Sequence, residues 1–157
     1  MHLSHEFADA AVRDEHVQGW RFQLSLFANV VADELHAGAA PAVDSWFAAW
    51  SEPDAIRREE RLARIAAPDV RFRDRFSLIA GIPDLVHHLG AAQRFMPGLR
   101  LTLEGDIRHC QGRVLADWVA LTGDGSERAR GTNLFIFGAH GLVESVTGFW
   151  SQPKPRS

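Results

Sequence analysis

The stretch RFRDRF, residues 71–76, places a carboxylate where a strand would carry apolar side chains. Its alternation predicts a strand in which Phe72, Asp74 and Phe76 share one face. If this face lines an enclosed interior, Asp74 can act as a general base, because burial raises the pKa of a carboxyl group. Two structural roles stay open: Asp74 ends the strand and caps the loop toward Gly81, or it pairs with a neighbouring arginine.

An imidazole in the next helical pattern could complete an acid–base pair. In residues 81–98 the apolar side chains face inward, and the helical turn brings His88 closer to that face than His87. His88 could then exchange a proton with Asp74; the alternative is a buried histidine that is only hydrogen bonded. Adjacent histidines diverge on a helix, so we expect no metal site here.

Aromatic and amide side chains could hold a ring-shaped ligand beside this pair. Trp46 and Trp50 are four residues apart on one helix face, where packing in the core is the alternative role. Asn133 lies on an apolar strand and, if buried, needs a partner from a neighbouring strand or from a ligand. Trp118 belongs to the more apolar face of its strand, so the adjacent Asp117 should face solvent or a subunit interface.

Apolar periodicity predicts the elements that position these groups. Helical patterns cover residues 24–37, 41–51 and 55–67, the third one capped by Asp54, with Ile56 facing inward, and ended by Pro68. A strand at 69–76 and a helix at 81–98 follow, and then four strands at 99–109, 113–123, 128–138 and 142–150. This order indicates an α+β domain, with helices packed on one face of a curved antiparallel sheet.

Composition excludes several classes of protein. The chain has 157 residues, enough for one domain with a real core, of which 46% are hydrophobic and 24% charged. A net charge of −3 without a basic cluster disfavours nucleic acid and anionic membranes as partners. Cys110 is the only cysteine, so an intramolecular disulfide is impossible and a cysteine-based metal site is not expected. The lack of a membrane-spanning run and of a signal-peptide pattern favours a cytoplasmic location.

The N-terminal segment contains a possible extra strand. EHVQGWRF, residues 15–22, echoes ESVTGFWS, residues 144–151. Either both are strands with the same propensities, or the first is an added strand that pairs at a sheet edge or with a partner subunit. We therefore divide the chain into an N-terminal extension (1–40), one domain (41–150) and a tail (151–157).

Over residues 41–150 the chain resembles the nuclear transport factor two-like superfamily, the fold of ketosteroid isomerases, SnoaL-like polyketide cyclases and scytalone dehydratases. The segments that carry the resemblance are VDSWFAAWSEPD, DVRFRDRF followed by GIPDLVHHL, GTNLFIF and GLVESVTGFW. The resemblance implies a cone-shaped, curved antiparallel or mixed sheet with helices packed on its concave face, enclosing a pocket. It also implies a homodimer.

Position by position, the resemblance places Asp74 where ketosteroid isomerases carry their general base. Trp46 and Asn133 stand where those enzymes have a tyrosine and a protonated aspartic acid as hydrogen-bond donors, and His88 stands at an aromatic pocket position. The N–H groups of Trp and Asn are far less acidic than those hydroxyls, which argues against steroid isomerisation itself. The resemblance also sends Ser145, Thr147 and Phe149 inward.

These inferences predict a small-molecule pocket whose catalytic pair is Asp74 and His88. The predicted ligand-binding residues are Trp46, Trp50, Phe72, Trp118, Asn133, Ser145, Thr147 and Phe149. The expected chemistry is cofactor-free acid–base catalysis on an apolar ring compound, as in an isomerase, a cyclase or a dehydratase. The alternative is a non-catalytic domain for ligand binding or dimerisation.

Overall fold

The computed structural model describes residues 2 and 4–151 and shows an α+β fold. Its helices are α1 (Ala10–Leu35), α2 (Ala39–Ser51), α3 (Ala55–Ala63) and α4 (Ile82–Phe95). Its strands are β1 (Ala66–Arg73), β2 (Leu78–Ala80), β3 (Arg100–Leu103), β4 (Arg108–Cys110), β5 (Arg113–Leu121), β6 (Glu127–Phe137) and β7 (Val143–Ser151). The predicted order of helices and strands is confirmed, and β2 is an additional short strand.

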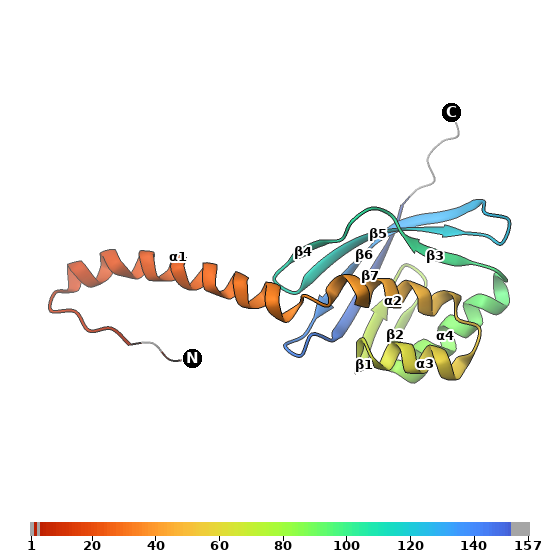
Figure 1. Ribbon diagram of the computed structural model, residues 1–157, viewed down its shortest axis with the longest axis horizontal. Helices are drawn as coiled ribbons and strands as arrows, with labels where there is room; N and C mark the ends of the chain where they lie inside the picture. Colours follow the sequence, from red (N-terminus) through yellow and green to blue (C-terminus); the bar gives the residue numbers. More distant parts are fainter. Residues whose placement is uncertain (1, 3, 152–157) are drawn as a thin grey trace, which may run out of the picture.

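The strands form one curved mixed sheet in the order β2-β1-β7-β6-β5-β3, with β4 also paired to β5. β1 and β7 run parallel, and the other neighbours run antiparallel. Figure 1 shows α2, α3 and α4 gathered on one side of this sheet, while α1 projects away from it. Residues 36–151 therefore form a cone, which is the name used below for the sheet with these three helices.

The core lies between the concave face of the sheet and α2. Alternate residues of β5 are buried, as expected for strands with one covered face. The Phe135 ring of β6 meets the rings of Trp46 and Phe47 of α2 edge-on, with centroids 5.7 and 6.1 Å apart. This packing fixes α2 on the concave face.

A buried arginine ties the three helices of the cone together. Arg58 of α3 is 3% exposed and donates hydrogen bonds to the backbone oxygens of Glu52 (2.6 Å) and Val86 (3.0 Å). Its guanidinium also lies within 3.3 Å of the side-chain oxygen of Gln93. Because these bonds connect the end of α2 with α4, they help to hold His88 of α4 in place.

Three details of the predicted elements are wrong. Asp54 caps α3 as predicted, accepting a bond from the Arg57 N–H at 2.9 Å, but Ile56 points outward. Pro68 does not end that helix, because it lies inside β1. The predicted strand 99–109 is split into β3 and β4, since Gly105 takes a φ of +74° that breaks the extended conformation.

The N-terminal segment contains one long helix, α1, and residues 10–35 form no strand. Residues 15–22, which suggested an added strand, lie inside α1. The helix begins early because the Asp9 carboxylate accepts bonds from the N–H groups of Ala11 (2.6 Å) and Val12 (3.4 Å). Of the predicted tail, Ser151 ends β7, and residues 152–157 lie outside the described residues. No helix in the described part of the chain is long and apolar enough to cross a membrane.

Candidate functional site

A cavity of about 630 Å³ opens between α4 and the concave face of the sheet. Six of the residues predicted from the sequence line it: Trp50, Phe72, Asp74, His88, Trp118 and Asn133. Most of its other walls are apolar, contributed by α4, β3, β5 and β6. The cavity has the size and character of a small-molecule site.

Asp74 is both a turn residue and a wall of the cavity. It follows the last residue of β1, and its carboxylate Oδ1 accepts a bond from the Phe76 N–H at 2.8 Å, while its own N–H donates to the Ser77 oxygen at 3.0 Å. Its Oδ2 accepts a bond from the Trp150 indole at 3.3 Å. The turn therefore aims a half-buried carboxylate at the cavity, with an indole rather than an arginine as its side-chain partner.

His88 faces the cavity, whereas His87 is exposed, as the helical geometry predicted. Its ring centroid lies 5.9 Å from those of Trp50 and Phe72, and its Nε2 lies 3.4 Å from the Ser77 hydroxyl oxygen. Burial among these groups lowers the pKa of His88 below its ordinary value, and the nearby charge of Asp74 opposes this only in part. The imidazole is therefore neutral at pH 7.

Asn133 and Trp118 form a buried hydrogen-bonded pair on neighbouring strands. The Trp118 indole N–H donates to Asn133 Oδ1 at 2.9 Å. An indole N–H can only donate, so the oxygen of the amide must face it, and Asn133 Nδ2 remains as a donor. Within the described residues no acceptor meets this nitrogen, and Asn133 lines the cavity. A ligand oxygen could accept this bond.

Gly131 makes room for the Trp118 indole. The two residues are paired across β5 and β6, and a Cβ at Gly131 would lie 2.6 Å from Trp118 Cζ2. Such a contact is impossible without moving the ring, so only glycine lets the indole lie across the neighbouring strand and reach Asn133.

Trp46 does not line the cavity. Its side chain is 1% exposed and packs in the core against Phe72 and Phe135. Its indole N–H is buried and meets no hydrogen-bond acceptor in the described structure. The prediction that Trp46 holds a substrate oxygen together with Asn133 is therefore wrong. Helix α2 approaches the sheet so closely that Trp46 fills the core, while Trp50, one turn later, reaches the cavity.

The prediction that Ser145, Thr147 and Phe149 face the pocket is also wrong. The pairing of β6 with β7 shifts between Ile136 and Phe137, so that β7 contains one extra residue at this point. Val143 and Val146, three residues apart, are both buried as a result. Beyond this bulge Val146, Gly148 and Trp150 lie on the concave face of the sheet, and Ser145, Thr147 and Phe149 lie on the opposite face.

Three residues of β7 that were not predicted from the sequence line the cavity: Gly148, Trp150 and Ser151. Gly148 is paired with Asn133, and a Cβ on it would lie 3.2 Å from Asn133 Oδ1 and 3.3 Å from Asp74 Cβ. Trp150 packs edge-on against Trp118 with centroids 5.4 Å apart, in addition to its bond to Asp74. The sequence pattern that could have identified Gly148 and Trp150 is the even-numbered set of residues in this strand, which contains a glycine and a tryptophan.

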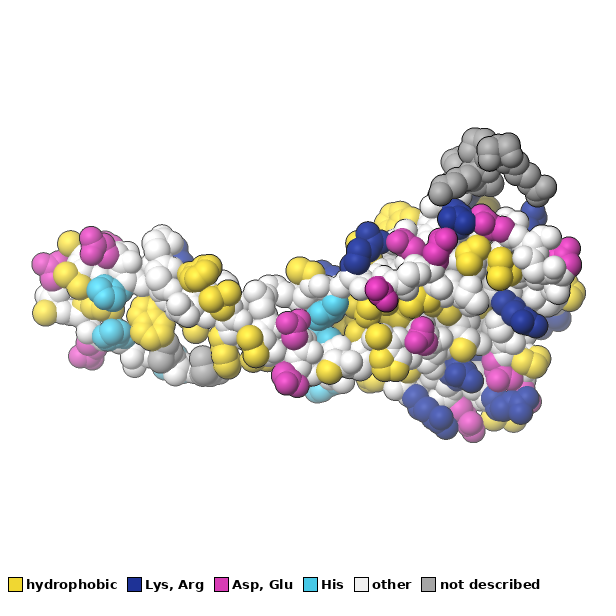
Figure 2. Space-filling model, turned by 45° about the horizontal axis from the view of Figure 1, so that its top comes forward, with side chains coloured by type: hydrophobic (Ala, Val, Ile, Leu, Met, Phe, Trp, Pro, Cys, Tyr) yellow, Lys and Arg dark blue, Asp and Glu magenta, His cyan; other side chains and the backbone are white. Residues whose placement is uncertain are grey.

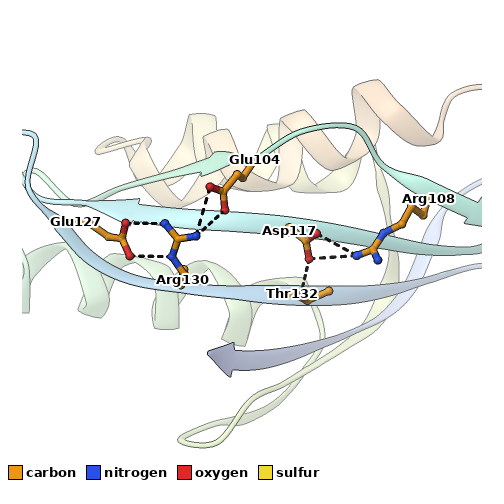
Figure 3. Close-up of polar contacts among 6 residues, drawn as sticks. All are labelled: Glu104, Arg108, Asp117, Glu127, Arg130 and Thr132. Carbon is orange, nitrogen blue, oxygen red and sulfur yellow. Dashed lines mark hydrogen bonds and ion pairs between the residues drawn. The ribbon is translucent and has the colours of Figure 1, made fainter. Parts of the chain in front are cut away.

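The convex face of the sheet, opposite the cavity, carries hydrogen bonds and ion pairs between charged and polar side chains. Figure 3 shows the Asp117 carboxylate accepting bonds from Arg108 and Thr132, as expected for a residue that points away from the cavity. In the same view Arg130 lies between Glu104 and Glu127. Its guanidinium nitrogens lie 3.2 Å from Glu104 Oε2 and 2.7 Å from Glu127 Oε2. Neighbouring carboxylates and their hydrogen bonds raise the pKa of Arg130, so this cation stays charged.

Comparisons with known proteins identify the fold. No protein-family model matches the chain, and no curated protein matches it in sequence. A crystal structure described as a candidate isomerase of the SnoaL-like family, from Agrobacterium tumefaciens, is 24% identical, with a TM-score of 0.69 over 76% of this chain and 99% of that one. A candidate polyketide cyclase from Sinorhizobium meliloti is 15% identical, with a TM-score of 0.56 over 69% and 94%.

A candidate SnoaL-like polyketide cyclase from a Jannaschia species is 14% identical, with a TM-score of 0.55 over 70% of this chain and 85% of that one. At these identities the similarity shows the fold and not the activity. The cone is thus the nuclear transport factor two-like fold, as the resemblance in the sequence indicated. What this cone does must come from its own cavity.

Proposed function

We propose that the cavity binds an apolar ring compound and that Asp74 acts on it as a general base. One observation carries this proposal: a carboxylate, a neutral imidazole and an amide donor face the same largely apolar cavity of about 630 Å³. Apolar walls with a few convergent polar groups are typical of sites that orient a small molecule for chemistry.

The geometry supports removal of a proton from a carbon next to a carbonyl group. Asp74 would accept the proton, and Asn133 Nδ2 would donate a hydrogen bond to the oxygen on which negative charge develops. His88, neutral at pH 7, would hold the proton in transit or return it elsewhere on the ring. This chemistry needs no cofactor, and isomerisation, cyclisation and dehydration all begin with it.

The described activities of the structural neighbours support the first two of these reactions. They are those of a candidate isomerase and of candidate polyketide cyclases. An amide N–H stabilises an enolate less than an acidic hydroxyl does, so the substrate of this chain should carry a comparatively acidic C–H group.

A non-catalytic binding protein is the second candidate. Both oxygens of Asp74 already accept hydrogen bonds, one within the turn and one from Trp150, an arrangement that also suits a carboxylate that only holds a ligand. In this case the cavity would bind ring compounds without transforming them, and Asp74 would contribute to affinity alone.

A proton-abstraction probe separates the two candidates. A nitro-substituted benzisoxazole opens when a base removes its ring C–H proton: the electron pair of that bond forms the nitrile, the electron pair of the N–O bond goes to the oxygen, and the product is one coloured cyano-nitrophenolate. Wild-type protein should accelerate this reaction, and Asp74→Asn should reduce the acceleration at least ~10-fold, because general bases contribute about 10²–10⁴-fold. Asp69→Asn is the matched control, since Asp69 lies exposed on β1, the strand that ends just before Asp74.

Affinity is measured separately with anilinonaphthalene sulfonate, a dye that fluoresces in apolar cavities. Under the enzyme proposal, Asp74→Asn changes the dissociation constant of the dye less than about threefold while the rate falls. If wild-type protein opens the ring no faster than free carboxylate in solution, or if Asp74→Asn opens it as fast as wild type, Asp74 is not a base. The binding candidate then stands.

A further inference from the structure

Helix α1 exposes an unusual amount of apolar surface. It has 26 residues, none of them buried. Nine of its large apolar side chains are between 40% and 62% exposed: Val12, Trp20, Phe22, Leu24, Leu26, Phe27, Val30, Val31 and Leu35. Figure 2 shows such side chains spread along the projecting helix, far from the cone. A water-soluble chain rarely leaves so much apolar surface without a partner.

Only the last turns of α1 touch the cone. The Gln111 amide donates a hydrogen bond to the Asn29 side chain, and His109 Nδ1 lies 3.4 Å from Asp33 Oδ1. After the helix, His36 packs against His109 with ring centroids 5.5 Å apart. These contacts orient the helix. Its N-terminal part lies outside the cone and has ring contacts with the preceding segment, His5 with Trp20 at 6.1 Å and Phe7 with His16 at 5.2 Å. Helices in proteins owe most of their stability to tertiary packing.

The spacing of the apolar residues fits pairing with another helix. Val17, Trp20, Leu24, Phe27 and Val31 follow one another at steps of three, four, three and four. This is the spacing of the inner positions of a coiled coil, which keeps one stripe of side chains on the line of contact between two helices. These five residues are called the seam below.

We propose that α1 is a self-association element that pairs with α1 of a second copy of this chain. Five of the nine exposed side chains, Trp20, Leu24, Phe27, Val31 and Leu35, lie on the side of the helix that carries the seam, and each is 40–53% exposed. In a homodimer with two-fold symmetry the same stripe of residues faces itself, so a second copy offers a matching apolar stripe.

The charges of α1 favour this partner over a membrane surface. Between Ala10 and Leu35 the helix carries two arginines against two aspartates and two glutamates. Helices that lie on membranes combine an apolar face with a basic one, and anionic lipids repel an acidic excess.

The structural neighbours are consistent with a helix added to the cone. The Agrobacterium structure is matched over 99% of its length but covers only 76% of this chain, so about a quarter of the chain is additional to that fold.

The test is the mass of the full-length protein in solution, measured by light scattering during gel filtration at tens of micromolar. Leu24→Asp combined with Phe27→Asp places two carboxylates in the seam. The matched control combines Gln18→Asp with Ser25→Asp, which adds the same charge on the opposite side of the helix. Binding of anilinonaphthalene sulfonate to the cavity reports that each variant has folded, because the cavity residues begin at Trp50, outside α1.

We expect wild type and the control to share one oligomeric mass and the seam variant to have half of it. A monomeric wild type would overturn the proposal, and so would a seam variant that keeps the wild-type mass. Binding of a monomeric wild type to phosphatidylcholine vesicles would also overturn it and would assign α1 to lipid.

Discussion

A single methyl group at Gly148 would separate the polar groups of the site. The Cβ of Gly148→Ala would lie 3.2 Å from Asn133 Oδ1 and 3.3 Å from Asp74 Cβ. Comfortable contacts begin near ~3.5 Å, so each neighbour must move by a few tenths of an ångström. The backbone of Gly148 is not in the left-handed region, so alanine adds no conformational strain and its higher strand propensity offsets part of the cost.

The variant should therefore fold almost normally and work poorly. We expect a change in the free energy of unfolding of no more than about 1 kcal/mol, which is ~2–4 °C in Tm for a chain of this size. Catalytic groups must sit within about 0.5 Å of their productive positions, so benzisoxazole opening should fall at least ~10-fold.

Scanning fluorimetry measures Tm, and the appearance of the phenolate measures the rate. Gly123→Ala is the matched control, because its Cβ would meet only Gly98 Cα, at 3.9 Å, in a turn outside the cavity. A Gly148→Ala protein with wild-type rate and wild-type dye affinity would refute the reasoning, since Asp74 and Asn133 would then not act together.

The remaining predictions concern stability. Trp118→Phe removes the buried bond to Asn133 and should cost about 1–3 kcal/mol, seen as a drop in Tm that shrinks when Asn133→Leu is added. Arg58→Met removes the guanidinium bonds to the Glu52 and Val86 oxygens, although the Glu52 oxygen keeps its bond from Gln93 Nε2 at 3.0 Å, and should cost about 1–3 kcal/mol in urea unfolding; an unchanged midpoint would contradict the clamp role. Folding lowers the pKa of His88, so below about pH 6.5 the unfolded chain binds a proton at this residue more readily than the folded chain does. The contribution of neutral His88 to the free energy of unfolding is therefore complete above that pH. It is lost as the pH falls toward the lowered pKa of the folded protein. Wild-type Tm should therefore fall more between pH 7 and 5 than that of His88→Gln, while His87→Gln, at an exposed position, should keep the wild-type slope.

Much of the cone could be predicted from the sequence because its signals are local. The apolar alternation of β5 distinguished Trp118 from Asp117, and the turn of α4 distinguished His88 from His87. Alternation predicted that Asp74 lies inside a strand at 69–76, but β1 ends at Arg73, and Asp74 lies in the following turn, where it also lines the cavity.

The errors arise where a distant partner decides the outcome. The bulge opposite Ile136 depends on how β7 pairs with β6, and it turns Ser145, Thr147 and Phe149 to the opposite face of the sheet. The sequence of β7 alone does not indicate this bulge. Trp46 was misplaced because the distance between α2 and the sheet depends on the packing of Phe135.

A crystal structure with a bound naphthol tests most directly whether the cavity accepts a ring beside Asp74. We predict density for the ring among Phe72, Trp118 and Trp150, with its hydroxyl within hydrogen-bonding distance of the Asp74 carboxylate or of Asn133 Nδ2. Density for the ring only on the outer surface, with the cavity closed by its own side chains, would contradict the account.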